Sequence, residues 1–320
     1  MLSLRVSTTA QLSPAVEQLL TNDPHVSSLT LLRGASVQPP GDVFLADIPR
    51  ESANAIVDQL RQLGVHLEGT IALNPVETWI SKPGHLAEEL APGQGADAVV
   101  WAQVTERAYD DSQLNWTYIS FMILATLLAS IAILTDSTIL VIGAMVLGPE
   151  FVPIAALGLA MVRKRPMLFR QALRTLALGF VISIAFTTAL AFLCNVTNLV
   201  DFADVNAPRP GTNFIYHVNW WSLVVAVIAG AAGVLSLTAS KGNGLVGVFI
   251  SVTTIPASGN IALGLAYGVW SQVLGSGAQL IVNIAGMAIA GWLTLLLQQR
   301  IWKGTTQAKV QQVPLLQADQ

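Results

Sequence analysis

The stretch LVIGAMVLGPEFVPIAALGLA, at residues 140–160, decides the fold. It is apolar and long enough to cross the roughly 30 Å hydrocarbon core of a membrane, but it carries Pro149, Glu150 and Pro153 near its middle. Proline removes a backbone donor and clashes with the preceding helical turn, so we predict a span that is interrupted inside the membrane. Carbonyls freed by such a break need partners or a wet cavity, because lipid offers none.

A second stretch, LVGVFISVTTIPASGNIALGLA at residues 245–266, resembles the first. Both begin Leu-Val, both end Ala-Leu-Gly-Leu-Ala, and both contain proline in the middle. Upstream, ILTDS (133–137) resembles SLTAS (236–240). The spans then group as three plus three, and an odd number of spans per copy means that the second copy is inverted. Chance similarity between apolar helices is the alternative explanation.

Six stretches are long and apolar enough to span a bilayer. They are 117–135, 138–162, 170–193, 218–239, 244–268 and 274–297. We therefore predict an α-helical polytopic membrane protein with six spans, a 3+3 inverted repeat, and broken second and fifth helices.

The basic residues predict the orientation of these spans in a plasma membrane. They cluster after the second, fourth and sixth spans, at Arg163, Lys164, Arg165, Arg170, Arg174, Lys241, Arg300, Lys303 and Lys309. Because basic residues favour the cytoplasmic side, both termini are expected in the cytoplasm and the loop 194–217 outside.

The first part of the chain has a different composition. Residues 1–96 hold 15 charged side chains, whereas the longer stretch 117–297 holds 11. Strand and helix patterns alternate in the order βαββαβ, with strands expected at 2–7, 26–33, 43–48 and 65–73 and helices after Ser13 and over 49–63. This order predicts a cytoplasmic ferredoxin-like α+β domain.

The expected domains are 1–75 for the ferredoxin-like domain, 76–116 for a linker and amphipathic helix, 117–299 for the spans and 300–320 for a cytoplasmic tail. The helix is expected over 97–113, with Trp101, Val104 and Ala108 on one face. It could lie on the membrane surface or pack against the soluble domain.

The sequence gives no support for a nucleic-acid partner, a disulfide, a metal site or a cofactor. A net charge of −3 gives no reason to expect nucleic acid, and Cys194 is the only cysteine, so no intramolecular disulfide can form. The scattered His25, His66 and His85 predict no metal site, and no cofactor is expected. The N-terminus lacks the pattern of a signal peptide.

The two interruptions supply the candidate binding residues. The second one groups hydroxyl and amide side chains around a proline, at Thr253, Thr254, Pro256, Ser258 and Asn260. Such a stretch can offer helix ends and side-chain oxygens to an ion or polar solute. A simple proline kink, with its serine bonded back to the helix, is the alternative.

Glu150 is the ionisable residue that lies deepest in the first repeat. A charged side chain at the centre of a membrane costs about 2.5–3.5 kcal/mol, so such residues are functional candidates. The competing interpretation is a protonated, structural acid that bonds freed carbonyls. Asp136, followed by Ser137 in the turn before the second span, is expected to be a structural cap.

The stretch 135–179 resembles the uncharacterised hydrophobic-domain family, domain of unknown function 389. The matching residues are Asp136, Ser137, Ile142, Gly143, Ala144, Met145, Pro149 and Pro153. The similarity is expected over roughly 105–240, and Glu150 departs from the apolar residue that many members have there. The resemblance implies a prokaryotic membrane protein and supplies no substrate.

The leading hypothesis for function is a transporter or channel for a small polar solute or ion. The alternative is a membrane-anchored sensor or regulatory scaffold whose cytoplasmic domain binds a metabolite or partner. An enzyme is not expected, because it would need a nucleophile with an adjacent base or a metal cluster, whereas no span contains histidine and the acids are few. The bilayer is the expected partner, and Gly264 with Gly268 would allow close helix packing within one chain or in a homo-oligomer.

Overall fold

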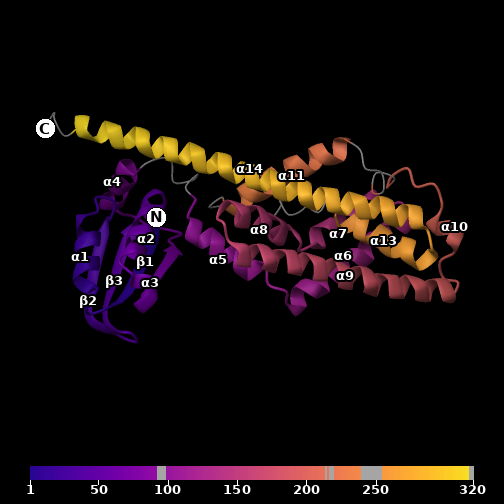
Figure 1. The fold of residues 1–320 in the computed structure, drawn as a ribbon, viewed down its shortest axis with the longest axis horizontal. Helices are drawn as coiled ribbons and strands as arrows, with labels where there is room; N and C mark the ends of the chain where they lie inside the picture. Colours follow the sequence, from indigo (N-terminus) through magenta and orange to yellow (C-terminus); the bar gives the residue numbers. More distant parts are fainter. Residues whose placement is uncertain (92–98, 213–214, 216–219, 239–253, 317–320) are drawn as a thin grey trace. The chain divides into compact units, whose positions relative to one another are not determined.

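The computed structural model describes residues 1–91, 99–212, 215, 220–238 and 254–316, with side chains up to residue 301. It divides into two compact units, one built on Met1–Val104 and the other lying within Thr105–Gln298 (Figure 1). The elements of the first unit are β1 (Leu2–Thr9), α1 (Ser13–Asn22), β2 (Ser28–Val37), β3 (Pro40–Ile48), α2 (Arg50–Gln62), α3 (Val65–Glu68), β4 (Thr70–Pro75) and α4 (Lys82–Leu90), followed by the start of α5 (Trp101–Asp111).

The first unit is a four-stranded antiparallel sheet with the order β2-β3-β1-β4. This order places β1 and β3 in the centre, as in a split βαβ arrangement. The alternating residues of β1 and β3 pair in register, for example Leu4 with Ala46 and Val6 with Phe44. Their inward side chains pack with apolar residues of α1 and α2, so both helices cover the same face of the sheet.

Two details differ from the expected elements. The predicted strand over 65–73 begins with the helical turn α3, which follows Gly64 in the left-handed conformation (φ 84°), and the strand starts only at Thr70. The prediction rested on the alternation of Val65, Leu67 and Ile71, and it was wrong for the first of them. Val65 lies in the hydrophobic core, but it belongs to a helical turn and not to a strand. Part of the expected linker also forms a helix, α4, which Ser81 caps by accepting a hydrogen bond from Gly84 N–H.

The first unit extends beyond the last strand. Val100 packs in its hydrophobic core. The Asn54 side chain donates to Val99 O over 2.6 Å and accepts from Trp101 N–H over 3.0 Å, which ties the start of α5 to α2. Residues 1–75 therefore lack contacts that belong to this unit.

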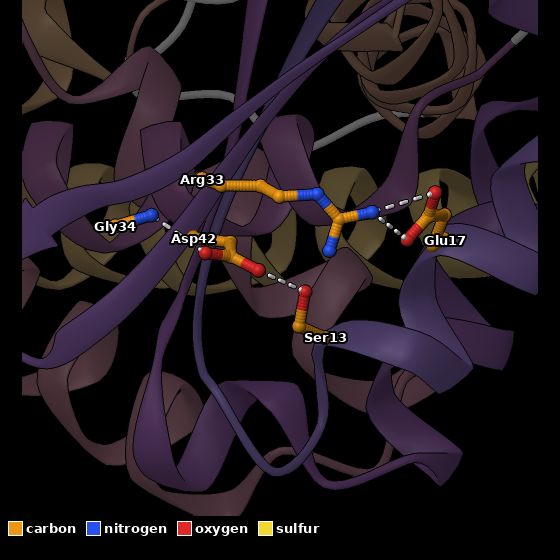
Figure 2. A network of polar contacts seen from close by, with 5 residues as sticks. All are labelled: Ser13, Glu17, Arg33, Gly34 and Asp42. Carbon is orange, nitrogen blue, oxygen red and sulfur yellow. Dashed lines mark hydrogen bonds and ion pairs between the residues drawn. The ribbon is translucent and has the colours of Figure 1, made fainter.

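A polar network joins α1 to the β2–β3 hairpin (Figure 2). The buried Asp42 accepts hydrogen bonds from the Ser13 hydroxyl and from Gly34 N–H. The bond from Ser13, followed by that from Gly34, lowers the pKa of Asp42. Beside it, Arg33 forms an ion pair with Glu17 at 3.1 Å, and this pair is solvent-exposed and so adds little stability.

A second charged pair makes the first unit sensitive to pH. His25 Nδ1 lies 2.8 Å from Asp23 Oδ1. This hydrogen bond is the main cause that raises the pKa of His25 above 6.5. Burial alone would raise the pKa of Asp23, but the hydrogen bonds and charge of His25 lower it. The His25 contribution to stability is thus complete below about pH 6.5 and is lost as the pH rises through its raised pKa. The Asp23 contribution is present above about pH 3.9 and is lost as the pH falls through its lowered pKa.

We expect Asp23→Asn to lower the pKa of His25, because the acceptor loses its charge. The variant should also lose stability most strongly between about pH 4 and 6.5, where both contributions are present. An NMR titration of the His25 ring and denaturant unfolding at pH 5 and pH 9 would measure these effects in the fragment 1–111. Asp58→Asn, at an exposed position on α2, is the matched control. An unchanged His25 titration would contradict the expectation.

The second unit consists of apolar helices. They are α6 (Trp116–Leu134), α7 (Thr138–Leu147), α8 (Phe151–Val162), α9 (Pro166–Val196), the short α10 (Phe202–Val205), α11 (Trp220–Thr238), α13 (Ile255–Tyr267) and α14 (Trp270–Leu316). Among the described residues, four helices are long and apolar enough to cross a membrane, and α7 with α8 gives a fifth candidate span with a 56° bend.

The number of spans is confirmed only in part. Residues 244–253, the first part of the predicted fifth span, lie outside the described residues, and α13 accounts for the rest of it. Large apolar side chains on the surface, such as Ile139, Val181 and Ile281, fit helices that face lipid. The second unit is therefore a helical bundle of membrane type, and the complete fifth span and the repeat remain predictions.

Candidate functional site

The break in the second span lies where the prolines predicted it. α7 ends at Leu147, α8 begins at Phe151, and Gly148, Pro149 and Glu150 separate them. Pro153 follows in the first turn of α8, where a missing N–H costs nothing. Glu150 occupies the position just before α8 and is fully buried.

The two predicted interruptions meet at this glutamate. Thr254 immediately precedes α13, whose first turn contains Pro256. The Thr254 hydroxyl donates a 2.8 Å hydrogen bond to Glu150 Oε1, and both side chains are completely buried. Residues 104 positions apart are thus joined at the N-terminal ends of two helices. Such ends carry partial positive charge, which stabilises a negative charge at Glu150.

The other predicted binding residues of α13 face different neighbours. Ser258 donates to Ile255 O of its own helix and lies 3.2 Å from Thr126 Oγ1 of α6. Asn260 Nδ2 donates to Ser276 Oγ of α14 over 2.9 Å. Thr253 lies outside the described residues. Glu150 and Thr254 therefore form the contact between the interruptions, while Ser258 and Asn260 connect α13 to α6 and α14.

The α14 helix contributes polar residues that sequence reasoning missed. Gln272, Ser276, Gln279 and Asn283 are all buried, and their spacing of four, three and four residues places them on one helix face. Farther along, the same face carries the apolar Met287 and Leu295. The spacing can be read from the sequence. It was missed because these polar residues are separated by apolar ones within a long hydrophobic span.

Two of these amides have no hydrogen-bond partner. Every side-chain nitrogen and oxygen of Gln279 and Asn283 is buried and unbonded among the described residues. Gln279 is 1% exposed and Asn283 is not exposed at all. A buried amide without a partner costs about 1–3 kcal/mol, so such a pair in one place indicates a ligand or bound water.

An arginine from the loop after α9 reaches the other end of this polar face. Arg209 is 6% exposed, and it donates to Gln272 Oε1 over 2.8 Å and to Asn260 Oδ1 over 3.5 Å. Arg209 was not among the candidate site residues that the sequence predicts. No pattern in the sequence showed that this loop folds back over α13 and α14.

Asp136 has a different role from the predicted helix cap. Ser137 caps α7 by accepting from Leu140 N–H. Asp136 adopts a left-handed conformation (φ 46°) and accepts from Gly211 N–H at 3.1 Å and from the Thr212 hydroxyl at 2.9 Å. It therefore anchors the loop that carries Arg209.

The comparisons with known proteins agree with the resemblance. Residues 145–289 match the family described as Domain of unknown function (DUF389). The match covers a little under half of the chain and bears out the resemblance to this family. The match starts and ends later than the expected 105–240, and it includes Glu150, Thr254, Gln279 and Asn283. Of the eight residues that carry the resemblance, the five from Asp136 to Ala144 precede the match, and Met145, Pro149 and Pro153 lie within it.

The chain is also similar to a curated relative from Methanocaldococcus jannaschii, Uncharacterized protein MJ0678. The two are 21% identical over 241 residues, which cover 75% of this chain and 71% of the relative. No solved structure matches the chain.

Proposed function

We propose that this membrane protein transports or conducts a small polar solute or an ion, with Glu150 and Thr254 at the binding position. The observation that carries this proposal is their buried hydrogen bond, which joins two interrupted helical segments in a bundle of membrane type. Many secondary transporters bind their substrates where interrupted helices meet near the midplane of the bilayer.

The directions of the helices support the proposed inverted repeat. Along α6 and α13, contacts progress in the same order. Thr126 contacts Ser258, Ser130 donates to Gly259 O, and Ile133 lies in one hydrophobic cluster with Leu263, so these two helices run parallel. The α7 helix returns along α6 after a short turn. The interrupted segments α7–α8 and α13 therefore run in opposite directions, as two inverted copies require. We place both termini in the cytoplasm of a prokaryotic cell, following the basic residues.

A sensor or scaffold, the second hypothesis, has no use for these features. A membrane anchor needs neither a buried glutamate in an interrupted span nor unbonded amides on a neighbouring helix. Both are costly in an apolar bundle, and in membrane proteins such groups commonly mark solute or ion sites.

We expect Glu150→Gln to fold normally and to lose the pH dependence of transport. The amide can still accept the bond from Thr254, but it cannot ionise. Proteoliposomes screened for uptake of small polar solutes and ions across a pH gradient would supply the flux, and the variant would then be compared with wild type. Glu77→Gln, an exposed acid in the first unit, is the matched control. Equal pH-dependent flux in both proteins would remove Glu150 from the mechanism, and no flux in any screen would contradict transport.

A further inference from the structure

We infer that Glu150, Thr254, Gln279 and Asn283 bind one alkali-metal cation. This inference rests on the proposed function, because it names the class of ion that the transport site takes. It depends on the positions of these residues, on the unbonded amides of α14, and on the single negative charge of the group.

The pairing of α13 with α14 places Asn283 at the level of Thr254. Asn260 bonds Ser276, and a Cβ atom added at Gly264 would lie 2.7 Å from Val273, so the two helices run antiparallel. From Asn260 back to Thr254, and from Ser276 on to Asn283, the chain advances six and seven residues, or about 9–10 Å at 1.5 Å per residue. Asn283 shares a helix face with Ser276, so it lies on the side of α14 that meets α13.

The packing of α8 against α14 independently places Asn283 at the level of Glu150. A Cβ atom added at Gly158 would lie 3.0 Å from Trp292 N and 3.2 Å from Ala288 O. Because α13 runs parallel to α6, and both α8 and α14 run opposite to them, α8 and α14 run in the same direction. Glu150 lies eight residues before Gly158, and an equal step back along α14 reaches the turn that contains Asn283.

The group offers oxygen ligands of the kind that hard cations prefer. They are one carboxylate, one hydroxyl and two carboxamide oxygens, and carboxylate and carbonyl oxygens suit hard metal ions better than soft ones. In the described part of the chain, no three His, Cys, Asp or Glu side chains lie close enough to hold a metal ion. The neutral oxygens of Gln279 and Asn283, which have no hydrogen-bond partner among the residues that the structure describes, are therefore the coordinating groups that complement Glu150.

Charge balance selects a monovalent ion. With Glu150 as its only ionisable member, the group carries one negative charge, which one monovalent cation neutralises. A divalent cation would leave a net positive charge in an apolar bundle, where uncompensated charge is strongly disfavoured. The positive N-terminal ends of α8 and α13 meet at Glu150 and would oppose that second charge further.

Equilibrium binding to the purified full-length protein in detergent tests the inference without any flux. At fixed pH 8, NaCl, KCl or LiCl replaces N-methyl-D-glucamine chloride at constant ionic strength, and tryptophan fluorescence follows thermal unfolding. At least one alkali cation is expected to raise the midpoint in a saturable way, while MgCl₂ and CaCl₂ are not. Binding of ²²Na⁺ or ⁸⁶Rb⁺ should saturate at one ion per chain.

Substitutions test whether the ion binds to these four residues. Glu150→Gln and Asn283→Leu are expected to weaken binding by about tenfold or more, because the first removes the negative charge and the second removes the carboxamide oxygen. Thr294→Val is the matched control on α14, since the Thr294 hydroxyl bonds only Ala290 O of its own helix among the contacts described. Asn283→Asp replaces the carboxamide with a carboxylate and so adds a second negative charge, and this variant should bind Ca²⁺ or Mg²⁺ more tightly than wild type does. Each variant must elute as a single species on size exclusion.

The outcomes separate this inference from the proposed function. Saturable alkali binding that Glu150→Gln abolishes supports the site, even if proteoliposomes show no flux, and transport then fails alone. Flux without saturable cation binding overturns the cation site and leaves transport standing. Equal binding by wild type and Glu150→Gln, or a preference of wild type for divalent ions, also overturns the cation site.

Discussion

Replacing Gly230 with alanine is expected to destabilise the helical bundle by about 1–3 kcal/mol, although it adds a single methyl group. Gly230 lies on α11 against the backbone of α14. An added Cβ atom would lie 2.4 Å from Met287 O and 2.7 Å from Met287 Cα. Because backbone atoms cannot rotate away as a side chain does, α11 and α14 must separate. Unfolding of the purified protein by heat or denaturant measures the loss.

Gly143→Ala is the matched control for this prediction. Gly143 is also a helical glycine of the bundle, but an added Cβ atom would meet only Leu128 Cδ2, at 3.7 Å. Alanine should there be neutral or stabilising by about 0.5–1 kcal/mol, because glycine loses more backbone entropy in a helix. Similar effects of the two substitutions would show that α11 and α14 are not packed as described.

Truncation after residue 75 is expected to cost the soluble unit several kcal/mol relative to a fragment that ends at residue 111. The shorter fragment corresponds to the domain expected from the sequence and has every predicted strand. It lacks Val100, whose burial contributes about 1.5–3 kcal/mol, and the two Asn54 hydrogen bonds to Val99 and Trp101, worth about 1 kcal/mol each. Circular dichroism during urea unfolding of the two fragments measures the difference.

Two variants of the longer fragment show which contacts matter. Asn54→Ala should remove about 2 kcal/mol, because both hydrogen bonds are lost. Leu67→Ala should have little effect, because Leu67 is 78% exposed. Equal stability of the two fragments would mean that the segment around Val100 is not part of this unit.

Local features could be predicted from the order of residues alone. Alternation along 2–7 and 43–48 identified β1 and β3, since residues two apart in a strand face the same side. Pro149 and Pro153 located the break between α7 and α8, because proline disrupts a helix wherever it is packed. Where one pattern suited two structures, as at Val65, the prediction failed, since a buried apolar residue fits a strand or a helix equally well.

Only the tertiary structure decided which of these elements meet. The contact of Glu150 with Thr254 spans 104 residues, and Asp136 binds a loop 75 residues away rather than capping its own helix. The polar face of α14 is likewise joined to a distant loop, because Arg209 bonds Gln272, 63 residues further along the chain. Helix periodicity and proline chemistry act over a few neighbouring residues and therefore appear in the sequence. Which buried side chains become partners depends on how whole helices pack, and that is set by many weak contacts acting together.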